Sequence, residues 1–305
     1  MFVMPLSVSH GLVQWVSGTD TLRAVVEKYR KMQNREPLEE YILLEKFSYN
    51  NYDFLQSLQK MQIIEKIFNI VPDSDIANTF WMKAKNAEEW MKQTHNFSIS
   101  AAMTSVVGYV IGLGDRHPSN LLVDRNTGKV IHIDFGDCFE RAAKRKFLPE
   151  VVPFRLTRMI VKAMGINGSD GIFKQTFINM SSLLRENKRV LIMVLAVFVH
   201  EPLIDPFTSN VEASEMESFP FQPQKRILSK ATTGSVIDKG RVYMCEQDSL
   251  SSVEMRNRVN QKLSGTDFDD EPNPLSVEDQ AIRLIETATD HYNLGMMYSG
   301  WCPFW

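Results

Sequence analysis

The stretch Gly112-Leu-Gly-Asp-Arg-His-Pro-Ser-Asn120, followed by Ile131-His-Ile-Asp-Phe-Gly136, is the part of the sequence that decides the fold. The first stretch interrupts the helical periodicity before it and predicts a loop. Gly114 and Gly136 permit tight backbone turns, because glycine carries no Cβ. Both stretches therefore predict sharply folded loops that present carboxylate and amide side chains.

A small hairpin is predicted between these loops. Leu121–Val123 and Val130–Ile133 are short β-rich runs, and Asn126-Thr127-Gly128 between them is a turn signal. Such a hairpin folds Asp134 back beside Asn120. The sequence thus brings the two loops together in space.

The polar side chains of these loops suit phosphoryl transfer. That reaction needs an acceptor for the substrate hydroxyl proton, ligands for Mg²⁺ and groups that stabilise charge on the phosphates. Asp115 and Asn120 have the spacing of a kinase catalytic loop, and Asp-Phe-Gly supplies a second metal ligand. We predict Asp115 as the proton acceptor, Asn120 and Asp134 as Mg²⁺ ligands, and His117 as a group that stabilises the transferring phosphoryl.

Each motif alone has a simpler explanation. An isolated Asp-Phe-Gly occurs by chance, and an isolated Asp-Arg-His is usually a solvated turn. Their occurrence in this order, joined by an apolar hairpin, is far more specific, because a motif gains weight from its structural context.

The composition is that of an ordinary globular protein, with 305 residues, 44% hydrophobic and 23% charged. A net charge of −3 argues against broad nucleic-acid binding, which needs a basic surface. Cys138, Cys245 and Cys302 are scattered and predict neither a disulfide framework nor a zinc site. Val190–Val199, the longest apolar run, is shorter than the roughly 20 residues of a spanning helix and is interpreted as a buried core helix. A cytoplasmic location is expected, with association with endomembranes as a further option.

The apolar periodicity predicts a mainly α fold with small β elements (α+β). Two short strands are expected within 2–16, and helices at 20–33, 37–72, 99–110, 155–165, 171–186, 188–200, 253–263 and 277–294. Residues 207–250 are rich in Ser, Thr, Glu, Pro and Gln, which predicts a flexible insertion.

The order Asp-Arg-His at 115–117, with the downstream His-Ile-Asp-Phe-Gly-Asp, resembles the phosphatidylinositol 3-kinase-related protein kinases. The resemblance implies a kinase large lobe that uses ATP with Mg²⁺, or Mn²⁺, to phosphorylate serine and threonine hydroxyls. Gly11-Leu-Val-Gln-Trp-Val16 resembles the family's hinge, which implies that Trp15 stacks on adenine and Val16 offers backbone hydrogen bonds. The positions that match the rest of the nucleotide pocket are Thr21, Leu122 and Ile133. The alternatives are a plain core aromatic for Trp15 and a helix cap for Thr21.

The terminal block, Tyr298-Ser-Gly-Trp-Cys-Pro-Phe-Trp305, resembles the FATC tail of the target-of-rapamycin (TOR) kinases. This implies growth and nutrient signalling, protein substrates, a β-propeller subunit docked at about 22–75 and a large scaffold subunit. The apolar tip, Trp301, Phe304 and Trp305, either enters a membrane interface or docks against the kinase lobe, and docking is the favoured alternative.

The resemblance divides the chain into five parts. These are the last small-lobe strands and hinge (1–16), the large lobe (17–206), the insertion (207–250), a linking helix (251–272) and the FATC tail (273–305). The glycine-rich loop, phosphate-binding Lys and partner Glu of the family have no counterpart here, so most of the small lobe is missing.

Two alternative functions stay open at this point. The missing small lobe allows a catalytically incomplete fragment or scaffold that binds partners without transferring phosphate. A phosphoinositide lipid kinase is the second alternative, since it shares the Asp-Arg-His loop and Lys144-Arg145-Lys146 is basic, although Glu150-Val151-Val152 stands where lipid kinases carry their basic cluster.

Overall fold

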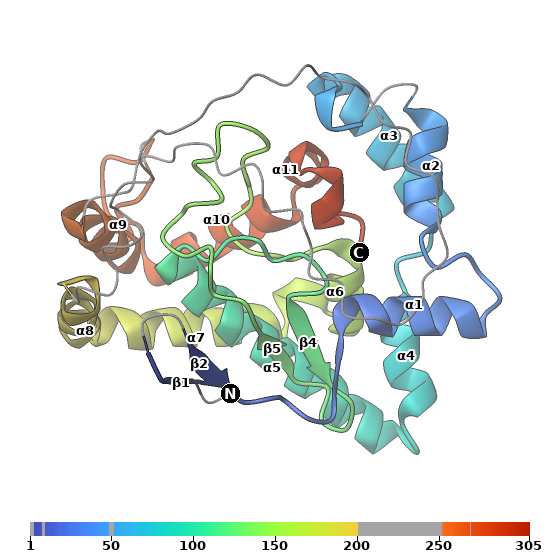
Figure 1. The fold of residues 1–305 in the computed structure, drawn as a ribbon, viewed down its shortest axis with the longest axis horizontal. Helices are drawn as coiled ribbons and strands as arrows, with labels where there is room; N and C mark the ends of the chain where they lie inside the picture. The colour runs from blue at the N-terminus through green and yellow to red at the C-terminus, as the bar shows by residue number, and fades with distance from the viewer. Residues whose placement is uncertain (1–2, 8–9, 49–51, 201–251, 269) are drawn as a thin grey trace.

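The computed structural model describes residues 3–7, 10–48, 52–200, 252–268 and 270–305, and a helix of 25 residues, α5, lies near its centre (Figure 1). That helix, Ala87–Ile111, begins where the Asn86 side chain accepts the backbone N–H of Glu89 at 2.8 Å. It ends at Gly112, whose φ of 61° suits a glycine at a helix C-terminus. Because α5 leads directly into the first loop motif, its end fixes where that loop starts.

The other helices surround α5 (Figure 1). They are α1 (Leu22–Met32), α2 (Glu39–Phe47), α3 (Ser57–Ile70), α4 (Asp75–Lys83), α6 (Arg158–Ala163), α7 (Ile172–Glu186), α8 (Lys188–His200), α9 (Ser252–Ser264), α10 (Val277–Thr289) and α11 (His291–Met296). The mainly α fold is therefore confirmed. α7 packs along α5, and α10 packs on α7.

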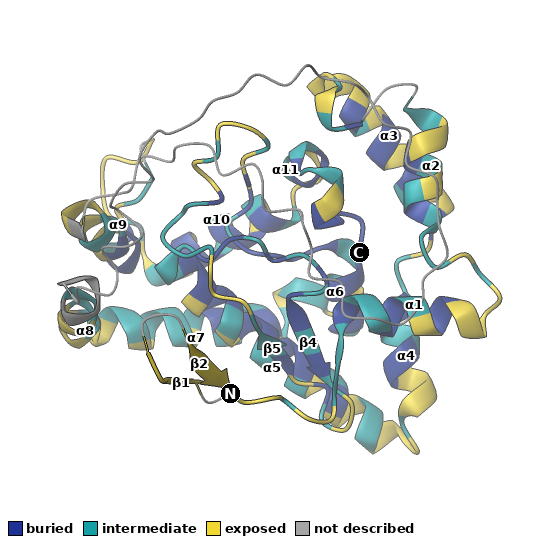
Figure 2. Ribbon diagram, in the orientation of Figure 1, coloured by how far each residue is buried: buried dark blue, intermediate teal, exposed yellow. Residues whose placement is uncertain are grey.

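A three-stranded antiparallel sheet carries the loops. Its order is β3 (Thr19–Thr21), β4 (Leu121–Asp124) and β5 (Val130–His132), so the predicted hairpin is confirmed. One face, with Leu121, Val123 and Val130, is buried toward α5. Figure 2 marks the buried parts of β4 in dark blue. The residues of the opposite face are half-exposed.

The second sheet is the hairpin of β1 (Val3–Pro5) and β2 (Gly11–Val13), which confirms the two short strands expected near the start. Its apolar side chains are exposed, among them Val3, Leu12 and Val13. The hairpin leads through Trp15 and Val16 to β3.

Several predicted elements differ in their limits. The helix expected at 37–72 is split into α2 and α3 with a 3-10 turn, Tyr52–Phe54, between them. The helix expected at 277–294 ends at Thr289, because the Asp290 side chain accepts the N–H of Asn293 and starts α11. Strand β3, helix α4 and the first half of α5 were not predicted. The insertion expected at 207–250 lies outside the described residues.

The interpretation of α8 as a buried core helix is wrong where its side chains are described. Val190, Met193 and Val194 are exposed, and among the described elements α8 makes its main contacts with α9 and α7. No helix in the described ranges is long and apolar enough to cross a bilayer.

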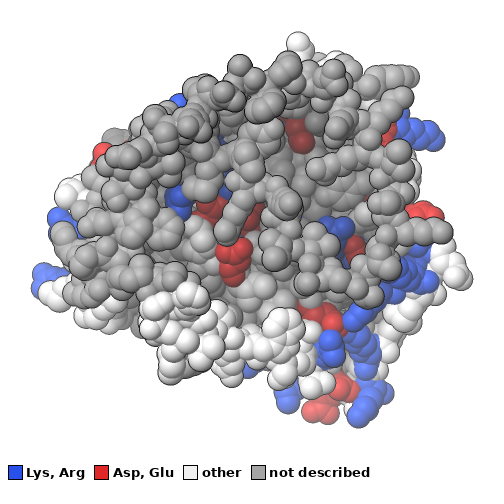
Figure 3. Space-filling model, viewed as in Figure 1, with Lys and Arg blue, Asp and Glu red and all other residues white. Residues whose placement is uncertain are grey.

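Charges of both signs are interspersed on the outer edge near α1 (Figure 3). Arg23 pairs with Glu27 at 2.8 Å, and Asp20 pairs with both Lys28 and Arg125. This mixture agrees with the near-neutral net charge and contrasts with the single-sign surface that nucleic acid favours.

Candidate active site

The first loop approaches the second so closely that one position must be glycine. A Cβ built on Gly114 would lie 2.2 Å from Cβ of Ala142, which follows the Asp-Phe-Gly motif. The backbone N–H of Gly114 also donates to Asp137 O at 2.8 Å. Any side chain at Gly114 would therefore push the two loops apart.

Arg116, which is 2% exposed, fastens the loops from inside. Its Nη1 donates to Ile133 O at 2.7 Å, its Nη2 donates to Asp134 O, and its Nε donates to Gly114 O at 2.8 Å. The N–H of Ile133 donates to Asn120 O at 3.1 Å. These bonds bring the segments of Asp115, Asn120 and Asp134 together, as the sequence predicted.

Asp115 has a left-handed backbone, with φ of 58°, and a half-buried carboxylate. His117 Nε2 lies 4.0 Å from its Oδ2. His117 Nδ1 accepts the N–H of Ser119 at 3.2 Å, which assigns the proton of a neutral ring to Nε2. Burial lowers the pKa of His117, so near pH 7 this ring acts as a neutral hydrogen-bond donor.

Asn120 and Asp134 fit a divalent cation with oxygen ligands. Asn120 is buried, and its Nδ2 donates to Asp115 O at 2.9 Å, which leaves its amide oxygen as the atom available to a ligand. Asp134 is exposed, and its Oδ1 accepts the N–H of Gly136 at 3.2 Å. Among the described residues no three His, Cys, Asp or Glu side chains gather into a metal cage. Mg²⁺ needs none, because it takes one or two protein ligands together with water and phosphate oxygens.

The predicted nucleotide residues fall on the half-exposed face of the sheet or at its edge. Thr21 pairs with Leu122, which pairs with Ile131, so these three side chains form one row. Ile133 follows on the same face, two residues beyond Ile131. The Thr21 hydroxyl also accepts the N–H of Ala24 at 3.1 Å and caps α1, so the alternative role holds as well.

Trp15 is 88% exposed, so it is not a core aromatic. Val16, beside it, is half-buried, and its carbonyl accepts the Thr19 hydroxyl at 2.9 Å. Both residues lie on the segment that precedes β3, the strand whose last residue, Thr21, begins the row.

Four residues of the site were missed by the sequence reasoning: Arg116, Ile131, Glu150 and Tyr298. Ile131 could have been found from the period-2 relation to Ile133. Glu150 is buried, and its Oε1 accepts the backbone N–H of Asp115 at 2.9 Å. Glu150 and Tyr298 carry no local signal, since they reach Asp115 from 35 and 183 residues away.

Burial raises the pKa of Glu150 to about 7, and the neighbouring Asp115 and Asp137 carboxylates add to this, while the hydrogen bond from Asp115 and the charge of Arg145 oppose it. The folded protein thus holds this proton more tightly than the unfolded chain. The resulting stability is fully present below pH 4.5 and is lost as pH rises through about 7.

Glu150→Gln should remove this pH dependence, because the amide stays neutral. The quantity to compare is the unfolding free energy of the variant minus that of wild type. This difference should be more positive above pH 7 than at pH 4.5, by up to about 3 kcal/mol. Urea unfolding at both pH values measures it, with the exposed Glu65→Gln as the matched control. Parallel pH dependences of wild type and Glu150→Gln would contradict the expectation.

The last residues of the chain dock against this site. Trp301, Phe304 and Trp305 are 0% exposed, so the structure favours docking over a membrane tip. The Arg155 guanidinium donates to the carbonyls of Trp301 at 2.7 Å, Cys302 at 2.6 Å and Trp305 at 2.8 Å, and also to Arg116 O at 3.1 Å. One buried cation therefore joins the tail to the loop of Asp115.

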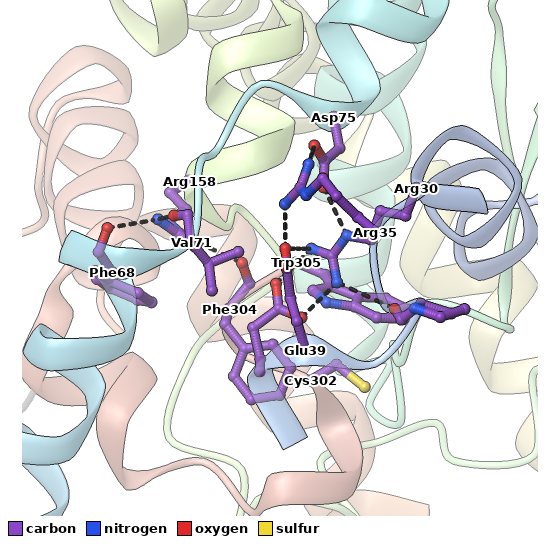
Figure 4. Close-up of polar contacts among 12 residues, drawn as sticks. Arg30, Arg35, Glu39, Phe68, Val71, Asp75, Arg158, Cys302, Phe304 and Trp305 are labelled. Atoms are coloured by element: carbon purple, nitrogen blue, oxygen red, sulfur yellow. Dashed lines mark hydrogen bonds and ion pairs between the residues drawn. The ribbon is translucent and has the colours of Figure 1, made fainter. Parts of the chain in front are cut away.

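Two further arginines, Arg158 and Arg30, also contact the tail (Figure 4). Arg158 donates to Phe304 O at 3.3 Å and to Val71 O at 2.7 Å. The Arg30 guanidinium, paired with Asp75 at 2.7 Å, lies 5.3 Å from the centre of the Trp305 ring. The tail is thus an internal part of the lobe.

The family comparison agrees with this geometry. The model of the phosphatidylinositol 3- and 4-kinase family matches residues 1–207. The chain belongs to this family. The FATC domain model matches residues 274–305, which contain the docked tail. The phosphatidylinositol 3- and 4-kinase family implies the use of ATP and a divalent metal, as the oxygen donors of the site suggest.

This kinase-family chain has several TOR kinases among its curated relatives. It is 40% identical to the target of rapamycin homolog of Caenorhabditis elegans and 37% identical to the serine/threonine-protein kinase TOR2 of Saccharomyces cerevisiae, each over 99% of the chain. The chain spans 11% and 12% of the length of those two relatives.

Solved structures support the fold. The FAT and kinase domain of CtTel1 superposes with a TM-score of 0.76 and 26% identity, covering 99% of this chain and 18% of that one. The Tel1 kinase butterfly symmetric dimer gives 0.71 and 27%, covering 96% and 11%. The family's kinase lobe and this chain therefore share one architecture.

Proposed function

We propose that this chain is the large lobe and FATC tail of a TOR-type serine/threonine protein kinase, which transfers the γ-phosphate of ATP to protein hydroxyls. The observation that supports it most is the Arg116 fork, which joins the loop of Asp115 to the carbonyls of Ile133 and Asp134. Together with the bond from Ile133 N–H to Asn120 O, the fork brings together the segments of Asp115, Asn120 and Asp134, to which we assign the proton acceptor and the two oxygen ligands.

Each residue then has a role in the reaction. Asp115 orients the attacking hydroxyl and accepts its proton, and His117 donates its Nε2 hydrogen bond to charge on the transferring group. Asn120 and Asp134 would hold the divalent cation through oxygen atoms. When bound, Mg²⁺, or Mn²⁺ in its place, neutralises charge on the phosphates.

The nucleotide base belongs on the face of Thr21, Leu122 and Ile133. These side chains, with Ile131 between them, form a partly apolar floor, and Trp15, on the segment that precedes β3, offers an exposed aromatic plane. Val16 lies between the two and offers its backbone to the base.

Protein substrates are favoured over lipid. The relatives are named serine/threonine-protein kinases, although the family model carries the name of lipid kinases. The basic run that supported a lipid substrate is partly neutralised, since Arg145 pairs with Asp137. Glu150, in the segment where a lipid kinase would be basic, points its carboxylate to the Asp115 backbone.

The partners proposed from the TOR resemblance are a β-propeller subunit and a large scaffold subunit. Residues 22–75 offer exposed apolar side chains to such a subunit, including Ile42, Phe54 and Leu58. The proposed domain limits follow from the same resemblance, and the proposed cytoplasmic location, with endomembranes as an option, follows from the scattered cysteines.

The test measures phosphate transfer by the natural protein isolated from its own cells. With Mg-ATP, a serine-containing protein substrate and phosphoinositide vesicles are offered in separate reactions. Phosphate on the protein substrate is the expected result. Phosphate on lipid alone would overturn the proposal, and absence of Mg-ATP binding would favour a scaffold.

A further inference from the structure

We propose that Tyr298, in the FATC tail, is a positioning residue of the active site that fixes the orientation of the Asp115 carboxylate. Its hydroxyl donates to Asp115 Oδ1 at 3.2 Å. This inference rests on the proposed function, because it assigns to Asp115 the role of proton acceptor.

Within the described residues the Asp115 backbone makes its direct hydrogen bonds to the lobe and not to the tail. Its N–H donates to Glu150 Oε1 and its carbonyl accepts Asn120 Nδ2, both at 2.9 Å. Its carboxylate is different. Within the described residues the one hydrogen bond to it comes from Tyr298, since His117 Nε2 stands 4.0 Å away. The tail residue Tyr298 therefore fixes the side-chain rotamer of Asp115, whereas residues of the lobe fix its backbone.

Tyr298 itself is rigidly placed. Its ring packs on a small apolar cluster that joins Val152 to the tail residues Leu294, Met297 and Trp301. The next residue, Ser299, donates both its N–H and its hydroxyl to Asp53, at 2.7 and 3.0 Å. Burial, with the charge of Asp115, raises the pKa of the Tyr298 hydroxyl, so it stays protonated and donates.

The Tyr298 ring lies so close to Gly300 that a side chain there would collide with it. A Cβ built on Gly300 would lie 2.9 Å from Cε2 of Tyr298. Gly300 lies in a 3-10 turn, Ser299–Trp301, and its φ is not positive, so alanine there is limited by the ring alone. Gly300→Ala should displace the Tyr298 hydroxyl without removing it.

The structure offers a matched control. Tyr52 also fixes the tail through one hydroxyl, which donates to Gly295 O at 2.6 Å, but that bond ends on backbone away from Asp115. Tyr52→Phe and Tyr298→Phe each delete one oxygen that ties the lobe to the tail. Only the second deletes a bond to the catalytic carboxylate.

The experiment measures kcat and KM for ATP of the protein as its own cell makes it. Tyr298→Phe and Gly300→Ala should each lower kcat about tenfold and leave KM within twofold, because a hydrogen bond to a charged group has been lost. Tyr52→Phe should lower kcat by less than twofold. In an Asp115→Ala background, Tyr298→Phe should cause no further loss, because it acts through that carboxylate.

Each other outcome is decisive. Equal losses in kcat for Tyr52→Phe and Tyr298→Phe would reduce Tyr298 to a tether and overturn the inference. The same holds if Tyr298→Phe raises KM in proportion to its loss of kcat, or if its effect persists without Asp115. A wild-type protein that transfers no phosphate would instead overturn the proposed function.

Discussion

Asp115→Asn should lower kcat about 10²–10⁴-fold while KM for ATP stays near that of wild type. The amide keeps the shape of the side chain and still offers an oxygen to the Tyr298 hydroxyl, but it cannot accept the proton of the attacking hydroxyl. The loop keeps its form, since Arg116 and Glu150 hold it through backbone atoms. Steady-state kinetics at saturating Mg-ATP measures the change.

Asp170→Asn is the matched control for this variant. The Asp170 side chain is 84% exposed and lies beside Lys174, in the 3-10 turn Gly168–Asp170. The same chemical change there should leave kcat within twofold. If Asp115→Asn retained more than a third of wild-type kcat, Asp115 would not be the proton acceptor.

The sequence predicted those residues of the candidate site that lie close together along the chain. Asp115 and Asn120 share one loop, and a hairpin of apolar strands returns Asp134 to them, so local patterns were enough. The tail as a whole was found because its sequence block is distinctive. Its docking was the favoured alternative, and the burial of Trp301 and Trp305 agrees with it.

What could not be predicted depends on long-range packing. Tyr298 reaches Asp115 across 183 residues, and Arg155 reaches the tail across 146 to 150. A lone Tyr or Arg in a sequence does not say which carbonyl or carboxylate it meets. Strand β3 was missed for a related reason: Thr-Asp-Thr has no apolar alternation, and it is a strand only because β4 lies beside it.

Arg155→Gln should lower the free energy of unfolding by about 3–5 kcal/mol, because it leaves several buried carbonyls without a donor. Arg155 is 4% exposed, burial lowers its pKa to about 10, and within the described residues its hydrogen bonds end on backbone carbonyls. Arg155 stabilises the tail through the hydrogen bonds of its guanidinium and through its cation–π contact with Trp301, whose ring centre lies 4.3 Å from Cζ. Arg155→Lys should recover only part of the loss, since an ammonium cannot reproduce the fork.

The same variant should also lower kcat, since Arg155 joins Arg116 O to the segment that carries Tyr298. Urea unfolding followed by tryptophan fluorescence should show Trp301 and Trp305 entering water at lower denaturant. Arg125→Gln is the control, because that guanidinium is 53% exposed and pairs with Asp20 at the surface, where an ion pair contributes little. Equal losses of stability from Arg125→Gln and Arg155→Gln would mean that burial of its aromatic side chains alone holds the tail. The hydrogen bonds from the Arg155 guanidinium would then add no stability.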